Sequence, residues 1–304
     1  MRYLIVGAGG TGGLIGGYLA RNNHAVTLVA RGKHLAAIRE KGLTIATCHE
    51  PAYTLRHIKA LAQEEVHGSY DVIFVCVKAY SLPEVLPLLE RTCTTETVII
   101  PIQNAMEAGN QLRAALPAHT VLDGCIYITG YVAEPGKIVQ NNRIFRIVYG
   151  PAKDAEVNQR VLDVLEKDLN SSGIHTRFTT NIQAELFRKL SFTSAFASTS
   201  AYEGLKAEDL QQEGPYRDRF IRFSEELKRI AEAARFTIAS DIVKDNVAIL
   251  DNLSKEFTAS IQKDMAAGRP DEREQLIFDI VRMAAHYRVE VPNYSQTAEL
   301  FGLK

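Results

Sequence analysis

Hydrophobic residues form short continuous runs in the first half of the chain and longer periodic stretches in the second half. Five of the apolar runs have the length of β-strands, at residues 3–6, 25–30, 72–77, 98–102 and 121–125. Helix-like stretches lie between them, including residues 14–22, 81–91 and 106–116. Continuous apolar runs are typical of parallel strands that are covered on both faces, and strands that alternate with helices indicate βαβ units. The pattern therefore predicts a doubly wound, mainly parallel sheet.

The pattern changes after residue 127. Short strands with turns at residues 134–136 and 141–142 look like an antiparallel edge, and they precede a helix at 154–169 and a last strand at 174–178. Beyond residue 179, apolar residues recur at helical spacing in two long stretches. They are Phe220, Phe223, Leu227, Ile230 and Ala234, and then Val243, Val247, Leu250, Phe257 and Ile261. No strand pattern occurs in this half, so we expect a second, all-helical domain.

Glycine is concentrated near the N-terminus, where seven of the twenty glycines lie between positions 7 and 17. They form a Gly-x-Gly-x-x-Gly pattern between a predicted strand and a predicted helix, with a second strand following. Glycine allows the tight turn, the close approach of backbone to a pyrophosphate and the close packing of helix on strand. A purely structural turn is the alternative, but this context favours a dinucleotide site. The predicted contacts are Gly7, Ala8, Gly9, Gly10, Thr11 and Gly12.

The residue that ends the second strand bears on the choice of dinucleotide. An acidic side chain there would bind a ribose 2′-hydroxyl and indicate NAD, but this chain has Arg31, followed by Lys33 and His34. A guanidinium can hold a 2′-phosphate through two parallel hydrogen bonds, so NADP(H) is favoured over NAD(H). A solvated loop arginine remains the alternative. We predict an α/β chain with an N-terminal Rossmann-type NADP-binding domain at residues 1–179 and a helical substrate and catalytic domain at residues 180–304.

Composition and charge narrow the class of protein further. Hydrophobic residues make up 46% and charged residues 23% of the 304 residues, which is ordinary for a globular chain. The net charge of −1, with no long run of like charges, argues against a nucleic-acid partner. Four scattered cysteines predict neither a disulfide framework nor a metal site. No apolar stretch approaches the length of a membrane span, and the first residues lack a signal-peptide pattern. We therefore expect a cytoplasmic protein, and leave a homodimer open.

Three polar residues are candidates for the chemistry of a dehydrogenase, which needs a proton donor for the oxygen being reduced. Lys189 belongs to a predicted helix at residues 181–197, although it could simply pair with Glu185 one turn earlier. Asn104 and Lys78 follow two of the predicted strands, and ligands bind at the carboxyl ends of parallel strands. A turn or a helix cap would explain these two residues equally well.

The motifs taken together resemble those of the ketopantoate reductase (2-dehydropantoate 2-reductase) family, which are NADPH-dependent enzymes of pantothenate synthesis. The resemblance extends from residue 1 to about residue 293. It rests on the glycine motif, Arg31, Val77-Lys78-Ala79, Gln103-Asn104, and the stretches at residues 184–190 and 260–272. Each motif is modest alone, whereas their common order and spacing are specific.

The resemblance implies roles for residues that match the family's motifs. Lys189 corresponds to the general acid that protonates the ketone oxygen, and Glu272 to the glutamate that supports this lysine and contacts the cofactor. Ser260 corresponds to a serine that binds the substrate carboxylate. Asn104 corresponds to an asparagine at cofactor and substrate, and Lys78 to a lysine near the cofactor ribose. Arg31 corresponds to the arginine that holds the 2′-phosphate.

The chain departs from the family where the substrate is recognised. Thr193 and Ala197 occupy positions at which the family usually has asparagines, and Ile277 occupies a third. Threonine still offers one hydrogen bond to a substrate, whereas alanine offers none. Fewer polar groups are then left to recognise the terminal hydroxyl of ketopantoate.

These observations predict an NADPH-dependent reductase of a small 2-oxoacid, with ketopantoate as the leading substrate. A related, more apolar 2-oxoacid is the alternative substrate. An NADP(H)-binding regulatory protein without turnover is the alternative function, although a sensor has no need of the proton donor Lys189. No metal is expected to take part.

Overall fold

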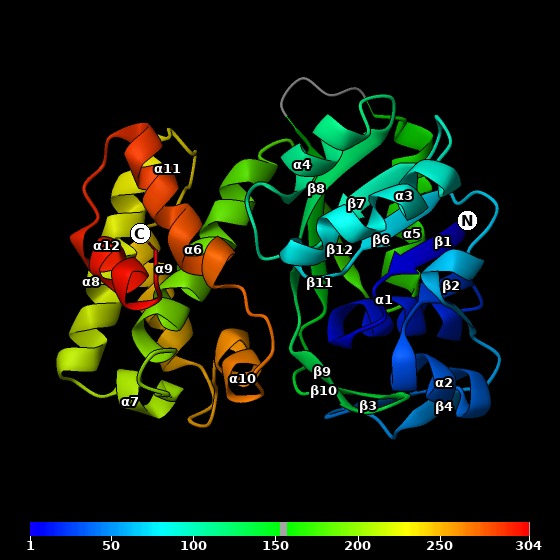
Figure 1. Ribbon diagram of the computed structural model, residues 1–304, viewed down its shortest axis with the longest axis horizontal. Helices are drawn as coiled ribbons and strands as arrows, with labels where there is room; N and C mark the ends of the chain where they lie inside the picture. The colour runs from blue at the N-terminus through cyan, green and yellow to red at the C-terminus, as the bar shows by residue number, and fades with distance from the viewer. Residues whose placement is uncertain (153–156, 304) are drawn as a thin grey trace. The chain divides into compact units, whose positions relative to one another are not determined.

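The computed structural model describes residues 1–152 and 157–303 (Figure 1). Backbone contacts divide the chain into two compact units. The first comprises Met1–Gln103 and Glu107–Ile182, and the second comprises Asn104–Met106 and Gln183–Lys304. The division lies close to residues 179–180. The inclusion of residues 104–106 in the second unit was not predicted from the sequence.

A mixed, mainly parallel eight-stranded sheet forms the centre of the first unit. Its strands, in spatial order, are β12 (His175–Phe178), β11 (Arg146–Pro151), β8 (Thr120–Tyr127), β7 (Val98–Pro101), β6 (Val72–Val75), β1 (Arg2–Val6), β2 (Ala25–Val29) and β5 (Lys59–Leu61). Neighbouring strands are parallel except β8 and β11, which are antiparallel. All residues of β6 and β7 are buried, as expected for strands covered on both faces.

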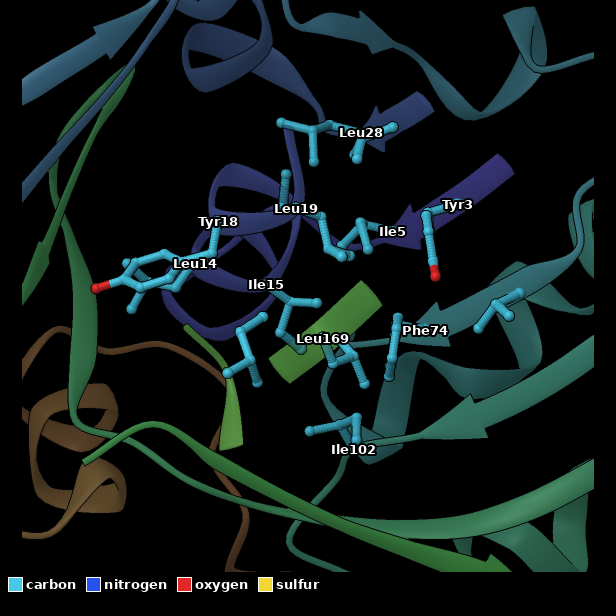
Figure 2. Packing of buried hydrophobic residues seen from close by; sticks show 14 of the residues in the cluster. Tyr3, Ile5, Leu14, Ile15, Tyr18, Leu19, Leu28, Phe74, Ile102 and Leu169 are labelled. Carbon is cyan, nitrogen blue, oxygen red and sulfur yellow. The ribbon is translucent and has the colours of Figure 1, made fainter. Parts of the chain in front are cut away.

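Helices of the first unit pack on this sheet and bury their apolar sides against it. They are α1 (Gly10–Arg21), α2 (Gly32–Lys41), α3 (Leu82–Thr92), α4 (Ala108–Ala115) and α5 (Gln159–Ser171), with 3₁₀ turns at Gln63–Glu65 and Ala79–Ser81. Figure 2 shows Ile5, Leu14 and Phe74 among the side chains of the buried core. The predicted start of α5 at residue 154 lies outside the described residues. In the structure this helix begins after Asn158, whose side chain accepts a hydrogen bond from the Arg160 amide.

A second, four-stranded sheet packs against α1, and it was not predicted. Its strands are β4 (Tyr53–Leu55), β3 (Leu43–Thr47), β10 (Lys137–Gln140) and β9 (Gly130–Glu134). The expectation of one antiparallel edge at residues 127–149 was therefore wrong in part. Strand β11 does pair antiparallel with β8. Strands β9 and β10, however, belong to the second sheet, where β10 pairs with both β9 and β3. Strands β3, β4 and β5 were missed because they are short and partly polar.

The glycines of α1 explain how this helix fits between its neighbours. A Cβ at Gly16 would overlap the Leu28 side chain of β2, and one at Gly17 would overlap the Ile45 side chain of β3. Glycine costs about 1 kcal/mol relative to alanine inside a helix, so its presence here reflects the close contacts that a side chain would prevent. The N-terminal glycine cluster thus serves packing as well as the turn.

The second unit is built from helices, and its described residues form no strand. The helices are α6 (Ile182–Ser200), α7 (Ala207–Gln211), α8 (Pro215–Ala233), α9 (Ile242–Asp251), α10 (Ser260–Ala266), α11 (Asp279–Tyr287) and α12 (Pro292–Leu300), with a π-helical turn at Glu274–Phe278. The apolar run predicted from Val243 to Ile261 is not one helix. It is interrupted after Asp251, where the Asn252 side chain donates to the Ala248 carbonyl and a turn joins Ser254 to Phe257.

The described residues contain neither a membrane-spanning helix nor a cluster of metal-binding side chains. No helix among residues 1–152 and 157–303 combines the length and the apolar character needed to cross a bilayer. In the same part of the chain, no group of three or more His, Cys, Asp or Glu side chains is arranged to hold a metal ion.

Candidate functional site

The glycine-rich loop joins β1 to α1 in a conformation that glycine makes accessible. Gly7 has φ +99°, a value that side chains disfavour, and a Cβ there would lie 2.9 Å from the Val77 amide nitrogen. The amides of Gly7 and Ala8 both donate to the Val29 carbonyl, at 3.2 and 2.8 Å. Ala8 is 3% exposed. These bonds fasten the first half of the loop to β2, so Gly7 and Ala8 shape the loop from within.

The second half of the loop presents backbone N–H groups. Gly9 is the N-cap of α1, is exposed, and has no heavy atom within 4 Å of where a Cβ would lie. The N–H groups of Gly10, Thr11 and Gly12 begin the helix and so have no acceptor within it. A helix N-terminus also carries partial positive charge, which stabilises an anion. Open space beside Gly9 and these donors fit a dinucleotide pyrophosphate.

Arg31 lies at the N-terminus of the next helix in the same unit. It follows β2 and is the N-cap of α2, where its extended backbone is exposed and its side chain makes no capping hydrogen bond. Lys33 is exposed in the first turn of the same helix. A guanidinium and a helix N-terminus both favour a phosphate, so these residues fit the 2′-phosphate of NADP(H).

A buried amide fixes the ends of two central strands, and sequence reasoning assigned it no role. Gln103 is 4% exposed, and its side-chain NH2 donates to the carbonyls of Val75 and Val77, at 3.0 and 2.9 Å. The backbone immediately before Lys78 is thereby tied to the backbone immediately before Asn104. Lys78 itself is half-buried at the start of a 3₁₀ turn. The position of Gln103 in the sequence could have suggested this role, because a residue that follows a strand of a doubly wound sheet lies at the ligand-binding edge.

The second unit brings Lys189 and Asn104 together although 85 positions separate them. The Lys189 ammonium donates to the Asn104 amide oxygen at 2.7 Å, and both side chains are half-buried. For Glu185, the alternative partner considered for this lysine, the structure shows an ion pair with Arg188 at 3.5 Å. An ammonium group carries three N–H donors, and here one of them is directed at a neutral amide oxygen. This arrangement suits a group that donates a proton to an oxygen.

The other predicted residues of this unit differ in their surroundings. Glu272 is 2% exposed and lies two positions before the π-helical turn, whereas Ser260 is exposed at the first position of α10. The Thr193 hydroxyl donates to the carbonyls of Lys189 and Leu190 in its own helix, at 3.0 and 3.2 Å. Ala197 and Ile277, which replace family asparagines, are completely buried.

Hydrogen bonds between helices hold the π-helical turn that follows Glu272. The Ser194 hydroxyl of α6 donates to the Leu276 carbonyl at 2.6 Å and contacts the Tyr294 hydroxyl of α12, also at 2.6 Å. The Leu276 amide in turn donates to the Glu272 carbonyl at 2.9 Å. π-Helical turns are rare and frequently occur at functional sites. Ser194 and Tyr294 were not among the predicted residues.

Comparison with protein families gives a match to each unit. The family described as "Ketopantoate reductase PanE/ApbA" matches residues 3–154, and the one described as "Ketopantoate reductase PanE/ApbA C terminal" matches residues 181–304. Together the two matches span most of the chain, and residues 155–180 between them include α5 and β12 of the first unit.

Individual relatives agree with this assignment. A 2-dehydropantoate 2-reductase of Halobacterium salinarum is 26% identical over 306 residues, covering 100% of this chain and 98% of that protein. An uncharacterised oxidoreductase of Bacillus subtilis, YkpB, is 30% identical over 197 residues, a match that spans 65% of this chain and 63% of that protein. The crystal structure of 2-dehydropantoate 2-reductase from Methylococcus capsulatus superposes with a TM-score of 0.84 at 26% identity, covering 99% and 96% of the two chains.

Proposed function

Because the chain belongs to the ketopantoate reductase family of oxidoreductases, we propose that it reduces 2-dehydropantoate (ketopantoate) to pantoate with NADPH, a step of pantothenate biosynthesis. The observation that carries the proposal is the hydrogen bond from the Lys189 ammonium to the Asn104 amide at 2.7 Å. It orients a half-buried proton donor on the helix where the family resemblance expects one. The relatives named 2-dehydropantoate 2-reductase support the choice of substrate.

The first unit would hold the cofactor. Gly9 to Gly12 would receive the pyrophosphate at the N-terminus of α1, and Arg31 would receive the 2′-phosphate. Lys78 would contact the ribose. When bound, NADPH supplies a hydride from its nicotinamide ring to the ketone carbon of the substrate. The preference for NADPH over NADH rests on Arg31, which stands where an NAD-binding chain would have an acidic residue.

Lys189 would supply the proton. Hydride addition leaves negative charge developing on the former ketone oxygen, which an ammonium can stabilise and then protonate. The hydrogen bond to Asn104 uses one of the three ammonium N–H groups and would fix the direction of the Lys189 side chain. The proton passes from Nζ to the oxygen, giving the hydroxyl of the product, and the neutral amine regains a proton from solvent. The buried Glu272 would orient Lys189, and Ser260 would bind the substrate carboxylate.

A different 2-oxoacid is the second candidate substrate, and the structure supplies a reason to test it. Ala197 and Ile277 are completely buried and apolar where the family usually has asparagines. The Thr193 hydroxyl, the one polar substitute, donates its proton to helix carbonyls. Thr193 keeps only acceptor capacity for a ligand, so a hydroxyl on the substrate would find fewer partners than in other family members.

Replacement of Lys189 by alanine tests the proposed reaction. We expect kcat with NADPH and ketopantoate to fall by roughly 10²–10⁴-fold, the range for losing a general acid or base. The Kd of NADPH, measured by fluorescence titration, should change little because the dinucleotide is assigned to the other unit. Lys244→Ala, an exposed lysine of α9, is the matched control and should behave as the unmodified protein. If Lys189→Ala keeps near-normal kcat while Lys78→Ala abolishes it, the roles assigned to the two lysines are reversed.

A further inference from the structure

The side chain of His34 joins the glycine-rich loop to another part of the first unit. Its Nε2 lies 2.9 Å from the Ala8 carbonyl oxygen, and its Nδ1 accepts a hydrogen bond from the Gly136 amide at 3.0 Å. A ring nitrogen that accepts carries no proton, so the proton must be on Nε2, which then donates to Ala8. Burial lowers the pKa of His34 and favours this neutral form. Both ring nitrogens are therefore used in holding protein backbone.

We propose that His34 is a positioning residue for the dinucleotide, because it sets the direction of the Gly9 N–H; this inference rests on the proposed function. The carbonyl of Ala8 and the N–H of Gly9 belong to one planar peptide group, in which the two bonds point in opposite directions. A donor that holds the Ala8 oxygen on one side therefore turns the Gly9 hydrogen to the other side. Gly9 is the exposed N-cap of α1, next to the space that fits the pyrophosphate.

The backbone that holds His34 is itself fixed by hydrogen bonds and close packing, so the imidazole has a defined position beside the loop. Gly136 lies in the turn between β9 and β10 with φ +80°, and its carbonyl accepts from the Thr44 amide at 2.8 Å. A Cβ at Gly136 would lie 3.1 Å from the Ala37 Cβ, which shows how closely this turn packs on α2. His34 belongs to the first turn of α2. The imidazole is thus held from two sides while it donates to the loop.

The hairpin of β9 and β10 also touches the loop directly. A Cβ at Gly10 would lie 2.5 Å from the Gly130 carbonyl oxygen and 2.8 Å from the Tyr131 Cα. The start of the hairpin therefore lies against the first residue of α1, and its turn reaches Ala8 through His34. The second sheet thus supports the dinucleotide loop.

Three substitutions of His34 separate its two hydrogen bonds. Glutamine can place an amide N–H near the Nε2 position and so keep the bond to Ala8. Asparagine can place an oxygen near the Nδ1 position, keeping the bond to Gly136 but not reaching Ala8. Leucine keeps similar bulk and neither bond. Each purified full-length variant is titrated with NADPH by fluorescence, and its thermal midpoint is measured without cofactor.

We expect His34→Leu and His34→Asn to raise the Kd of NADPH roughly three- to tenfold, the factor that one orienting hydrogen bond accounts for. His34→Gln should stay within about twofold of the unmodified protein, and kcat at saturating NADPH should change little in all three variants. NADH serves as a second probe, because the pyrophosphate is common to both dinucleotides. Its Kd should rise by the same factor.

Two results would overturn the inference. One is unchanged affinity in His34→Leu. The other is a Kd of NADPH that rises in proportion to the loss of thermal midpoint across the three variants, with the same Kd in His34→Asn and His34→Gln. That result would mean that His34 affects only stability. Failure of the proposed function is measured on the unmodified protein. If that protein binds NADPH but does not reduce ketopantoate, only the proposed function fails. If it binds neither NADPH nor NADH, both the proposed function and the inference about His34 fail.

Discussion

Two glycines of the dinucleotide loop should respond in opposite ways to the same substitution. Gly9 has an extended backbone with φ −72° and ψ −161°, which alanine adopts readily, and open space where a methyl group would lie. Gly12 is buried, and a Cβ there would overlap the Gly7 carbonyl oxygen and come within 2.9 Å of the Cys76 Cβ. Gly9→Ala therefore tests the approach of a ligand, and Gly12→Ala tests the packing of helix on strand.

The magnitudes follow from these surroundings. At Gly9, an alanine reduces the freedom of the unfolded chain but is a poorer N-cap than glycine, so the free energy of unfolding should change by less than about 1 kcal/mol. At Gly12, overpacking against backbone should cost about 3 kcal/mol, offset by about 1 kcal/mol of helix propensity. For a unit of this size the remaining 2 kcal/mol corresponds to a fall in Tm of roughly 4–8 °C.

The two variants should also differ in cofactor binding. A methyl group on Gly9 would stand where the pyrophosphate approaches the backbone, displacing at least one charge-assisted hydrogen bond worth about 1.5–3 kcal/mol. The Kd of NADPH should therefore rise roughly ten- to over a hundredfold in Gly9→Ala, while its Tm without cofactor stays near that of the unmodified protein. Scanning calorimetry and fluorescence titration measure the two quantities. Unchanged affinity in Gly9→Ala, or a loss of Tm there as large as in Gly12→Ala, would refute the reasoning.

Three further predictions concern cofactor choice, substrate choice and stability. Arg31→Ala should remove most of the preference for NADPH over NADH, measured as the ratio of kcat/KM values, and equal values in the unmodified protein would reject the assignment. If Thr193, Ala197 and Ile277 leave the pocket less polar, a 2-oxoacid that lacks the terminal hydroxyl should be reduced at least as well as ketopantoate; strong discrimination against it would contradict this. Glu226 is 1% exposed and accepts from three N–H groups at the start of α12. In urea titrations, Glu226→Ala should lower the free energy of unfolding by about 3 kcal/mol, and Glu226→Gln should lower it clearly less.

The main sheet and the helical second unit could be predicted because their signals are local. Strands β6 and β7 are buried on both faces, so their residues are continuously apolar, and the long helices of the second unit repeat apolar residues along one face. The glycine motif was equally local, since a turn, a helix N-terminus and close packing all impose glycine within a few residues. The second sheet had no such signal. Its strand β3 is completed by β10, about ninety positions later in the chain.

The candidate site divides in the same way. Gly9 and Arg31 could be assigned from their place after a strand, whereas Lys189 needed the family resemblance because nothing near it in the sequence points to Asn104. The sequence pointed to His34 only as a neighbour of Arg31. Its observed partner Gly136 lies 102 positions away, so neither its tautomer nor its hold on the loop could be derived from the chain alone.

Polar residues deep in the second unit show why such supports escape sequence reasoning. Glu226 of α8 holds the first turn of α12, which carries Tyr294. The Tyr294 hydroxyl contacts the Ser194 hydroxyl, which donates to the Leu276 carbonyl within the π-helical turn. Each link joins segments that are 68 to 100 positions apart. In sequence these side chains look like ordinary surface positions on amphipathic helices. Because these polar groups are buried, each of them needs a hydrogen-bond partner. The Leu276 carbonyl accepts from Ser194, and the Leu276 amide donates to the Glu272 carbonyl. Ser194 belongs to the same helix as Lys189, so these hydrogen bonds tie the helix of the proposed catalytic lysine to the π-helical turn and to α12.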